Sequence, residues 1–414
     1  MTIPSGRFVV LAAASALALR CGFAAAQAAP AAEPPLTLPA AIELAIGSHP
    51  ALRAAAHDVA ASSAAIEQAR QLPNPELSYL REGRDAGTRT TTIQLNQPIE
   101  LGGKRRARVA LAQAGLDVAV GERQARRQAL RADVIAAYFD VLAASERAAL
   151  AEQAAKLAER SADVVSRRVA AGKASPVDAA RARLVPADAR IERDRAATAL
   201  AIARQRLEAL TGLTVADRTL QAPQLPVPTA LPAAPDRAER APAVRRAGRE
   251  LALQQARVDV ERAARVPDLT LTVGSQRDDQ VARRQAVVGV AIPLPLFNRN
   301  AGNVVAARER AAQAQAQLEA ARLEARSALA VATLQYTQAR DEAALLAQTV
   351  VPDAQHVYES TLKGFEYGKF AFLDVLDAQR TLLQARTRQL QALHDAWRAR
   401  AELEQLNGDD GEQP

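Results

Sequence analysis

Asp374 and Asp377 are the pair of residues in this chain whose type and spacing most suggest a chemical role. They stand in the stretch Asp374-Val-Leu-Asp377. Residues three apart share one face of an α-helix, so both carboxylates can point the same way. Paired carboxylates at one place attract cations and repel anions. A plainer interpretation is that Asp374 caps the helix while Asp377 pairs with a nearby arginine.

Other residues able to bind metals or to catalyse reactions are few. The four histidines, His49, His57, His356 and His394, lack the close spacing of metal ligands. Neither paired catalytic carboxylates nor a nucleophile with a matching base stands out. Gly102-Gly103 follows a strand pattern without a fuller phosphate motif, which favours a flexible joint. We therefore expect no enzyme, no cofactor and no resident metal.

The N-terminus has the pattern of a secretory signal. Arg7 precedes the apolar run Phe8–Leu19, and Ala24-Ala-Ala26 or Ala26-Gln-Ala28 offers a cleavage site. We predict a signal peptide over residues 1–26. Cys21, the only cysteine, follows Leu19-Arg20 rather than small residues, so we do not expect it to be lipidated. A mature chain without cysteine has no disulfide and no thiolate metal site.

Composition favours long helices and argues against nucleic acid as a partner. Only 3% of the residues are aromatic, and alanine and arginine dominate. The formal charge is +7, but lysine and arginine are spread among acidic residues without interleaved aromatics. No further stretch is long and apolar enough to cross a bilayer as a helix, so any membrane span must consist of β-strands.

The chain repeats its own plan after about 195 residues. His49-Pro-Ala-Leu-Arg53 returns as Ala241-Pro-Ala-Val-Arg245, and Gly172-Lys173 returns as Gly368-Lys369. We predict a first structural repeat over residues 36–213, a proline-rich connector over 214–240 and a second repeat over 241–409.

The pattern of each repeat predicts a helix, a strand pair, a very long helix and a return helix. Apolar and polar residues alternate in the strand pairs, as in Thr91 to Asn96, with strands long enough to span a bilayer when tilted. The first helix should run from about Leu36 to Gln71, capped by Thr37; Ser175 should cap the first return helix, and Pro186 and Pro352 should kink their helices. The remaining predicted elements are strand pairs 76–99 and 267–293, long helices 100–171 and 299–366, and return helices 175–212 and 372–407.

Four membrane-length strands cannot close a barrel alone, because open strand edges are not tolerated in lipid. Several chains must therefore share one barrel, and twelve strands from three chains can leave a channel. A helix of roughly 70 residues reaches about 100 Å and must project from so small a barrel. The fold class is therefore mainly α with a small β part, arranged as a conduit.

The doubled plan resembles the TolC-like family of outer-membrane efflux channels. The stretch Gln97-Pro-Ile-Glu-Leu-Gly-Gly-Lys-Arg105 and its counterpart Ile292-Pro-Leu-Pro-Leu-Phe-Asn-Arg-Asn-Ala-Gly302 resemble the heavy-metal branch, of the cobalt–zinc–cadmium type. The resemblance implies a homotrimer with a 12-strand barrel in outer-membrane lipid and a helical coiled-coil tunnel in the periplasm. It further implies a periplasmic adaptor protein and an inner-membrane, proton-driven pump of the resistance-nodulation-division type as partners.

The same resemblance implies roles for particular residues. Asp374 and Asp377 match the aspartates that ring the periplasmic constriction of the family's tunnel, which gives six carboxylates per trimer. Gly172, Lys173, Gly368 and Lys369 match the turns that contact the adaptor, although any helical hairpin needs a glycine stop. The expected function is passive conduction of divalent heavy-metal cations. The alternatives are the same channel type serving drug efflux or type I secretion, and a periplasmic coiled-coil scaffold.

Overall fold

The computed structural model describes residues 35–85, 88–172, 175–214, 220 and 237–407. The predicted signal peptide, Cys21 and most of the predicted connector lie outside these residues. Within the connector, Leu220 forms an isolated parallel bridge with Leu36, and a short helix already begins at Arg237. Among the helices that the structure describes, none is both long and apolar enough to cross a membrane.

In the described residues, the first half contains four helices and two strands. Thr37 and Ser175 cap their helices as predicted, with side chains that accept hydrogen bonds from the backbone N–H groups of Ala40 and Val177. Helix α3 has 67 residues, which at 1.5 Å per residue gives a length of about 100 Å. The helices of this half are α1 (Leu38–Ser48), α2 (Pro50–Arg70), α3 (Lys104–Ala170) and α4 (Pro176–Thr211).

The second half follows the same order with one extra irregularity. Its helices are α5 (Arg237–Arg240), α6 (Pro242–Ala263), α7 (Ala301–Leu345), the π-helical turn η1 (Leu346–Val350), α8 (Val351–Glu366) and α9 (Phe372–Asn407). The π-helical turn ends at Val350, two residues before Pro352, which has no N–H group to donate to the preceding turn. A kink was predicted at Pro352, and the structure shows a change in hydrogen-bond register beside it.

The first predicted helix differs from the observed structure. The single helix predicted from Leu36 to Gln71 is divided at His49, whose backbone is extended (φ −66°, ψ 126°) because Pro50 follows it. The His49 side chain then caps the next helix by accepting a hydrogen bond from the Ala51 N–H group. Helix α4 continues through Pro186 as a single element, and the kink predicted there stays a prediction.

The four strands in the described part of the chain form one antiparallel sheet in the order β1-β2-β3-β4. The strands are β1 (Glu76–Glu82), β2 (Thr90–Ile99), β3 (Leu269–Asp278) and β4 (Arg283–Ala291). The two halves of the chain meet in this sheet, because β2 pairs with β3. The sheet leaves β1 and β4 as edge strands. The second hairpin turn is short, because the pairing of β3 with β4 continues to Asp278 and Arg283.

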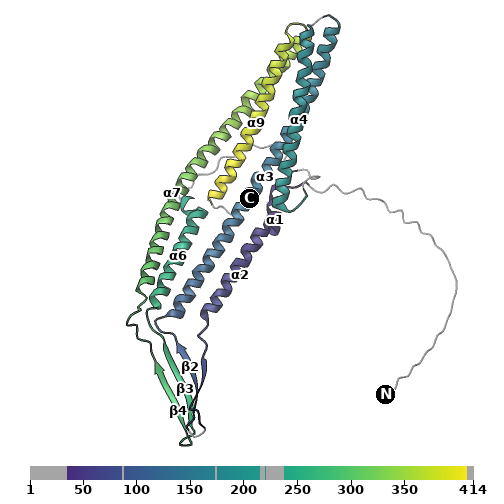
Figure 1. Cartoon of the computed structure of the whole chain (residues 1–414). Helices are drawn as coiled ribbons and strands as arrows, with labels where there is room; N and C mark the ends of the chain where they lie inside the picture. The colour runs from purple at the N-terminus through teal and green to yellow at the C-terminus, as the bar shows by residue number, and fades with distance from the viewer. Residues whose placement is uncertain (1–34, 86–87, 173–174, 215–219, 221–236, 408–414) are drawn as a thin grey trace, which may run out of the picture. The chain divides into compact units, whose positions relative to one another are not determined.

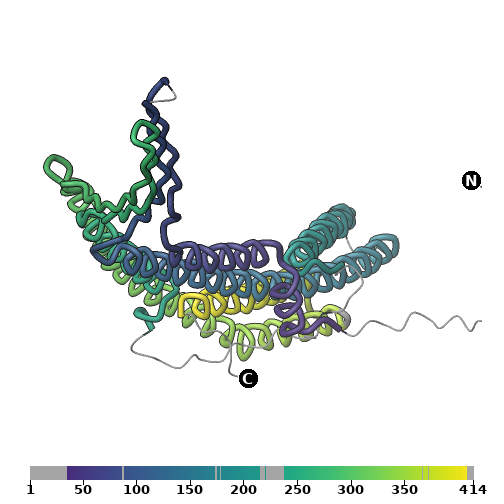
Figure 2. Tube along the Cα trace, turned by 90° about the horizontal axis from the view of Figure 1, so that it is seen from below, coloured from purple at the N-terminus to yellow at the C-terminus, as the bar shows by residue number. Residues whose placement is uncertain are grey.

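The sheet and the two helical turns lie at opposite ends of the helices. In Figure 1 the strands extend from the ends of α2, α3, α6 and α7, whereas the turns joining α3 to α4 and α8 to α9 lie at the far end. Figure 2 shows the strands leaving the helices at one end in a second view. Helix α3 contacts α1, α2, α4, α6 and α9, so it is the central element of the packing.

The core is a series of seams between helices rather than one globular centre. The largest cluster lies between α1, α3, α4 and α9, where Val134, Val141 and Leu207 are fully buried. Phe139 and Trp397 stack there with ring centroids 4.1 Å apart. Smaller clusters lie between α6 and α7, between α7 and α9, and between α8 and α9. Alanine occupies many buried positions, which lets neighbouring helices approach closely.

Candidate functional site

The start of α9 holds both candidate aspartates on its exposed side. Val375, Ala378 and Leu382 form the buried side of the helix and pack against Tyr358 and its neighbours on α8. Asp374 and Asp377 are exposed. The heptad-like spacing of the apolar residues therefore leaves the two carboxylates outside the buried contact between α8 and α9.

Asp374 caps the helix, as the plainer interpretation expected. Its carboxylate accepts a hydrogen bond of 2.8 Å from the backbone N–H group of Ala371, and its own N–H group donates to the Ala371 carbonyl. Among the described residues, no ion pair or hydrogen bond reaches the Asp377 carboxylate. Capping uses one oxygen of Asp374 and leaves its charge in place, so the two interpretations of this residue are compatible.

The two aspartates line an open groove together with a third carboxylate, which was not predicted from the sequence. Asp353 lies in the first turn of α8, directly after Pro352, where acidic residues are favoured. The groove has a volume of about 770 Å³ and its polar lining consists of Thr349, Asp353, Thr361, Asp374, Asp377 and Thr381. Asp353 could have been noticed in the sequence because it directly follows a proline, a pattern typical of a helix start.

The helical turns are built on glycines with left-handed backbones. Gly172 has φ 69° and Gly368 has φ 76°, a region that favours glycine. Around Gly368 the Lys369 N–H group donates to the Gly364 carbonyl and the Gly368 N–H group donates to the Phe365 carbonyl, which completes a Schellman motif. Lys173 lies outside the described residues.

One side-chain contact joins the two hairpins near these turns. The Arg168 guanidinium lies over the Phe365 ring, 4.6 Å from its centroid. Arg168 belongs to the last turn of α3 and Phe365 to α8. No local pattern predicts this contact, because it joins residues almost two hundred positions apart.

A second contact between the halves lies in the middle of the helices. The His394 ring on α9 is 2.5 Å from an Asp140 carboxylate oxygen on α3 and 3.1 Å from that of Asp395. Burial alone would raise the pKa of Asp140, but His394 and the charges of Arg398 and Arg206 outweigh it, so the pKa lies below its usual range. This pair stabilises the crossing of α3 and α9.

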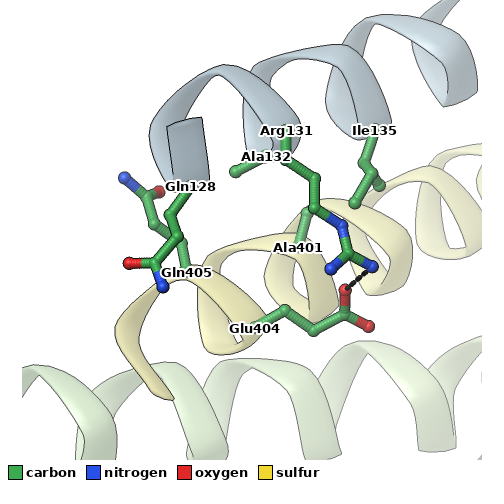
Figure 3. Close-up of a pocket in the computed structure, with 7 residues that line it drawn as sticks. All are labelled: Gln128, Arg131, Ala132, Ile135, Ala401, Glu404 and Gln405. Carbon is green, nitrogen blue, oxygen red and sulfur yellow. Dashed lines mark ion pairs between the residues drawn. The ribbon is translucent and has the colours of Figure 1, made fainter. Parts of the chain in front are cut away.

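A small polar cavity also lies between α3 and α9 (Figure 3). It is lined by Gln128, Arg131, Ala132, Ile135, Ala401, Glu404 and Gln405. Arg131 and Glu404 form an ion pair of 3.9 Å across it. The cavity volume is about 10 Å³, which is close to the least that holds one water molecule. It is therefore too small for a ligand.

The sheet has one apolar and one polar face, and the apolar face is the more exposed. Leu77, Leu95, Val273 and Val288 form one cross-strand row, and their exposed fractions are 71%, 46%, 54% and 74%. On the other face, Asn96 accepts a hydrogen bond from the Thr272 hydroxyl, and both residues are half-buried. A sheet in water buries its apolar face, so this arrangement suits an apolar surrounding.

In the described part of the chain, no group of three histidine, cysteine, aspartate or glutamate side chains could hold a metal ion. The histidines are separated by the fold: His49 caps α2, whereas His394 binds Asp140. The candidate site is thus an exposed set of carboxylates beside a groove.

These features define a class of protein. A model of the family described as "Outer membrane efflux protein" matches the chain twice, over residues 41–213 and 235–409. The chain belongs to this family and is an outer-membrane efflux channel component. The double match also confirms the predicted internal repeat.

The chain is 44% identical over 380 residues to the cobalt-zinc-cadmium resistance protein CzcC of Cupriavidus metallidurans, covering 90% of each chain. It is 31% identical to the nickel and cobalt resistance protein CnrC of the same organism, covering 67% of this chain and 68% of CnrC. The fold is that of the outer-membrane channel OprN (TM-score 0.77, 22% identity, covering 90% and 89% of the two chains). It is also that of the outer membrane protein VceC of Vibrio cholerae (TM-score 0.75, 20% identity, covering 90% and 96%).

Proposed function

We propose that this chain forms a homotrimeric channel that conducts divalent heavy-metal cations out of the periplasm. The observation that carries the substrate class is the 44% identity to a cobalt-zinc-cadmium resistance protein over nearly the whole chain. Three copies bring twelve strands together, with the edge strand β4 of one copy beside β1 of the next. The helices continue the channel on the periplasmic side.

The exposed carboxylates at the start of α9 form the constriction of this channel. In a trimer, Asp374 and Asp377 contribute six carboxylates around one axis, and such a ring concentrates cations and repels anions. Asp377 supports this role because its carboxylate has no partner among the described residues. Conduction requires weak binding, and a ring of separate carboxylates on exposed helix faces binds cations more weakly than a closed metal site.

The energy for transport comes from partner proteins. The turns at Gly172-Lys173 and Gly368-Lys369 dock a periplasmic adaptor, which links the channel to an inner-membrane, proton-driven pump of the resistance-nodulation-division type. The placement of both turns at the end opposite the sheet supports this arrangement, because one partner can contact both (Figure 1). Basic residues in the last turn of α3, Arg167 and Arg168, lie beside this contact surface.

Growth of a deletion strain tests the substrate class. The strain is grown across a panel of zinc, cadmium, cobalt, nickel and copper salts and hydrophobic drugs, with the wild-type gene restored as the control. Sensitivity to divalent metals alone, reversed by the wild-type gene, supports the proposal and identifies the ion. Sensitivity to drugs alone would remain consistent with an efflux channel but would contradict the proposal that its substrates are divalent metal cations.

A further inference from the structure

The sheet carries a row of arginines near its two hairpin turns. Arg81 pairs with Thr91, Thr91 with Arg277, and Arg277 with Arg284. Residues paired across antiparallel strands point to the same face, so all three guanidinium groups leave the sheet on one side. Neighbouring strands lie about 4.8 Å apart, so the row is close to continuous across the width of the sheet.

This arginine row lies on the apolar face. Two residues along each strand, Tyr79, Ile93, Ser275 and Ala286 form the next row, and the row after it consists of Leu77, Leu95, Val273 and Val288. Ile99 and Leu269 close the same face at the helical end. Ile99 and Thr91 are eight positions apart, which covers about 27 Å of strand, so one face combines a membrane-sized apolar surface with a single cationic border.

The charges of the row are largely uncompensated on that face. Arg277 forms an ion pair of 2.8 Å with Asp279 in the following turn. Among the described residues, no carboxylate pairs with Arg81 or Arg284. The acidic residues at the adjacent level, Glu82 and Asp278, belong to the opposite face of the sheet.

A cationic border beside an apolar surface fits a lipid with an anionic head group. Arginine on a lipid-facing strand is tolerated only near the membrane surface, which places the row at head-group level. Tyr79, one row nearer the apolar surface, is a residue type that is favoured at this level. The planar guanidinium binds phosphate through two parallel hydrogen bonds, so phosphate is the anion that the row is best suited to recognise.

We propose that Arg81, Arg277 and Arg284 bind the phosphate groups of a phosphorylated glycolipid in the outer leaflet of the outer membrane. Its acyl chains lie against the apolar rows that contain Leu77 and Val288. This inference rests on the proposed function, because a periplasmic location of the helices is what directs the hairpin turns outward. In the trimer, Arg284 of one copy approaches Arg81 of the next, so the arginine rows join into a belt.

Lipid binding by the purified full-length protein tests this proposal. Native mass spectrometry measures binding of bisphosphorylated lipid A, of its dephosphorylated form and of phosphatidylglycerol. The variant R81Q/R284Q removes two charges from the row. The control R84Q/R283Q removes two charges from the same end of the sheet, one in a turn and one on the opposite face. R81K/R284K keeps the charge and loses the paired hydrogen bonds.

We expect R81Q/R284Q to bind bisphosphorylated lipid A roughly 30-fold more weakly than the wild type does. The control should change by less than about threefold, and the lysine variant should fall between them. Equal losses in both double variants, or equal binding of lipid A with and without phosphate, would overturn the proposal. Equally tight binding of phosphatidylglycerol would contradict the choice of glycolipid.

Single-channel recording of the same preparations separates this inference from the proposed function. Wild type and R81Q/R284Q should give the same conductance in planar bilayers, which also shows that the variant folds. If the wild type forms no trimeric pores, the proposed function fails. If pores form and R81Q/R284Q binds lipid A as the wild type does, only the lipid site is wrong.

Discussion

At the scale of single residues, Asp374 combines a helix cap with a charge, and the two can be separated by mutation. Asparagine keeps an oxygen that accepts the Ala371 N–H hydrogen bond, whereas alanine removes it. We expect D374N/D377N to weaken block of the channel by divalent cations about tenfold or more, since a trimer loses six charges. Single-channel currents recorded with increasing divalent cation measure the block.

The control for this prediction removes two exposed aspartates elsewhere. D259N/D341N changes α6 and α7, where each aspartate pairs with an arginine on its own helix. It should leave divalent block unchanged. D374A should match D374N in block but lose about 1 kcal/mol of helix stability through the missing cap. Unaltered block in D374N/D377N would remove these residues from the constriction.

The Asp140–His394 pair predicts a specific dependence of stability on pH. Because the pKa of Asp140 lies below its usual range in the folded chain, its contribution is complete above about pH 4. The contribution disappears as the pH falls through the lowered pKa. D140N should cost about 1 kcal/mol at neutral pH, a value reduced by partial exposure of the pair. Thermal unfolding from about pH 7 to pH 3 should show the difference from wild type shrinking with acid.

At the scale of elements, two glycines with different backbones should respond in opposite ways to alanine. Gly368 has φ 76° and open space around it, so alanine there costs about 1 kcal/mol through backbone strain alone. Gly248 lies inside α6, also in open space, and alanine there should add about 0.5–1 kcal/mol. Thermal midpoints of G368A and G248A relative to wild type measure the two effects, and a shift of the same sign in both would contradict this account.

The sequence was sufficient for the elements whose signal is local. The alternation of apolar and polar residues predicted the strands. Thr37 and Ser175 were recognisable as helix caps because capping depends on neighbours within a turn. The division at His49 was also a local signal, since Pro50 restricts the residue before it, but the surrounding helical pattern outweighed it. Contacts between the halves, such as Arg168 with Phe365, depend on how the helices pack and have no sequence signature.

In the candidate site, too, some features could be predicted from the sequence and others required the fold. The i, i+3 spacing of Asp374 and Asp377 placed them on one helix face before the fold was known. Asp353 joins their groove because α8 packs against α9, and that pairing follows from the tertiary arrangement. The register between β2 and β3, which aligns Thr91 with Arg277, likewise required the fold.

At the scale of the whole molecule, neighbouring residues of the edge strand β4 should differ sharply in their tolerance of charge. Val288 lies on the exposed apolar face, in the row with Val273, whereas Val287 pairs with Gly274 on the opposite face. In the proposed trimer, the first side chain faces lipid and the second faces the channel. V288R should cost about 2–4 kcal/mol of membrane insertion, and V287R far less.

Outer-membrane fractions analysed for heat-sensitive trimers provide the measurement. V288R should lose most of the trimer, whereas V287R should assemble and reduce the preference of the channel for cations, because it adds three positive charges to the conducting path. The two variants have the same composition, charge and position along the chain to within one residue, so strand propensity cannot explain a difference between them. Equal trimer yields would mean that the apolar face of β4 does not meet lipid, and the proposed sharing of one barrel by three copies would fail.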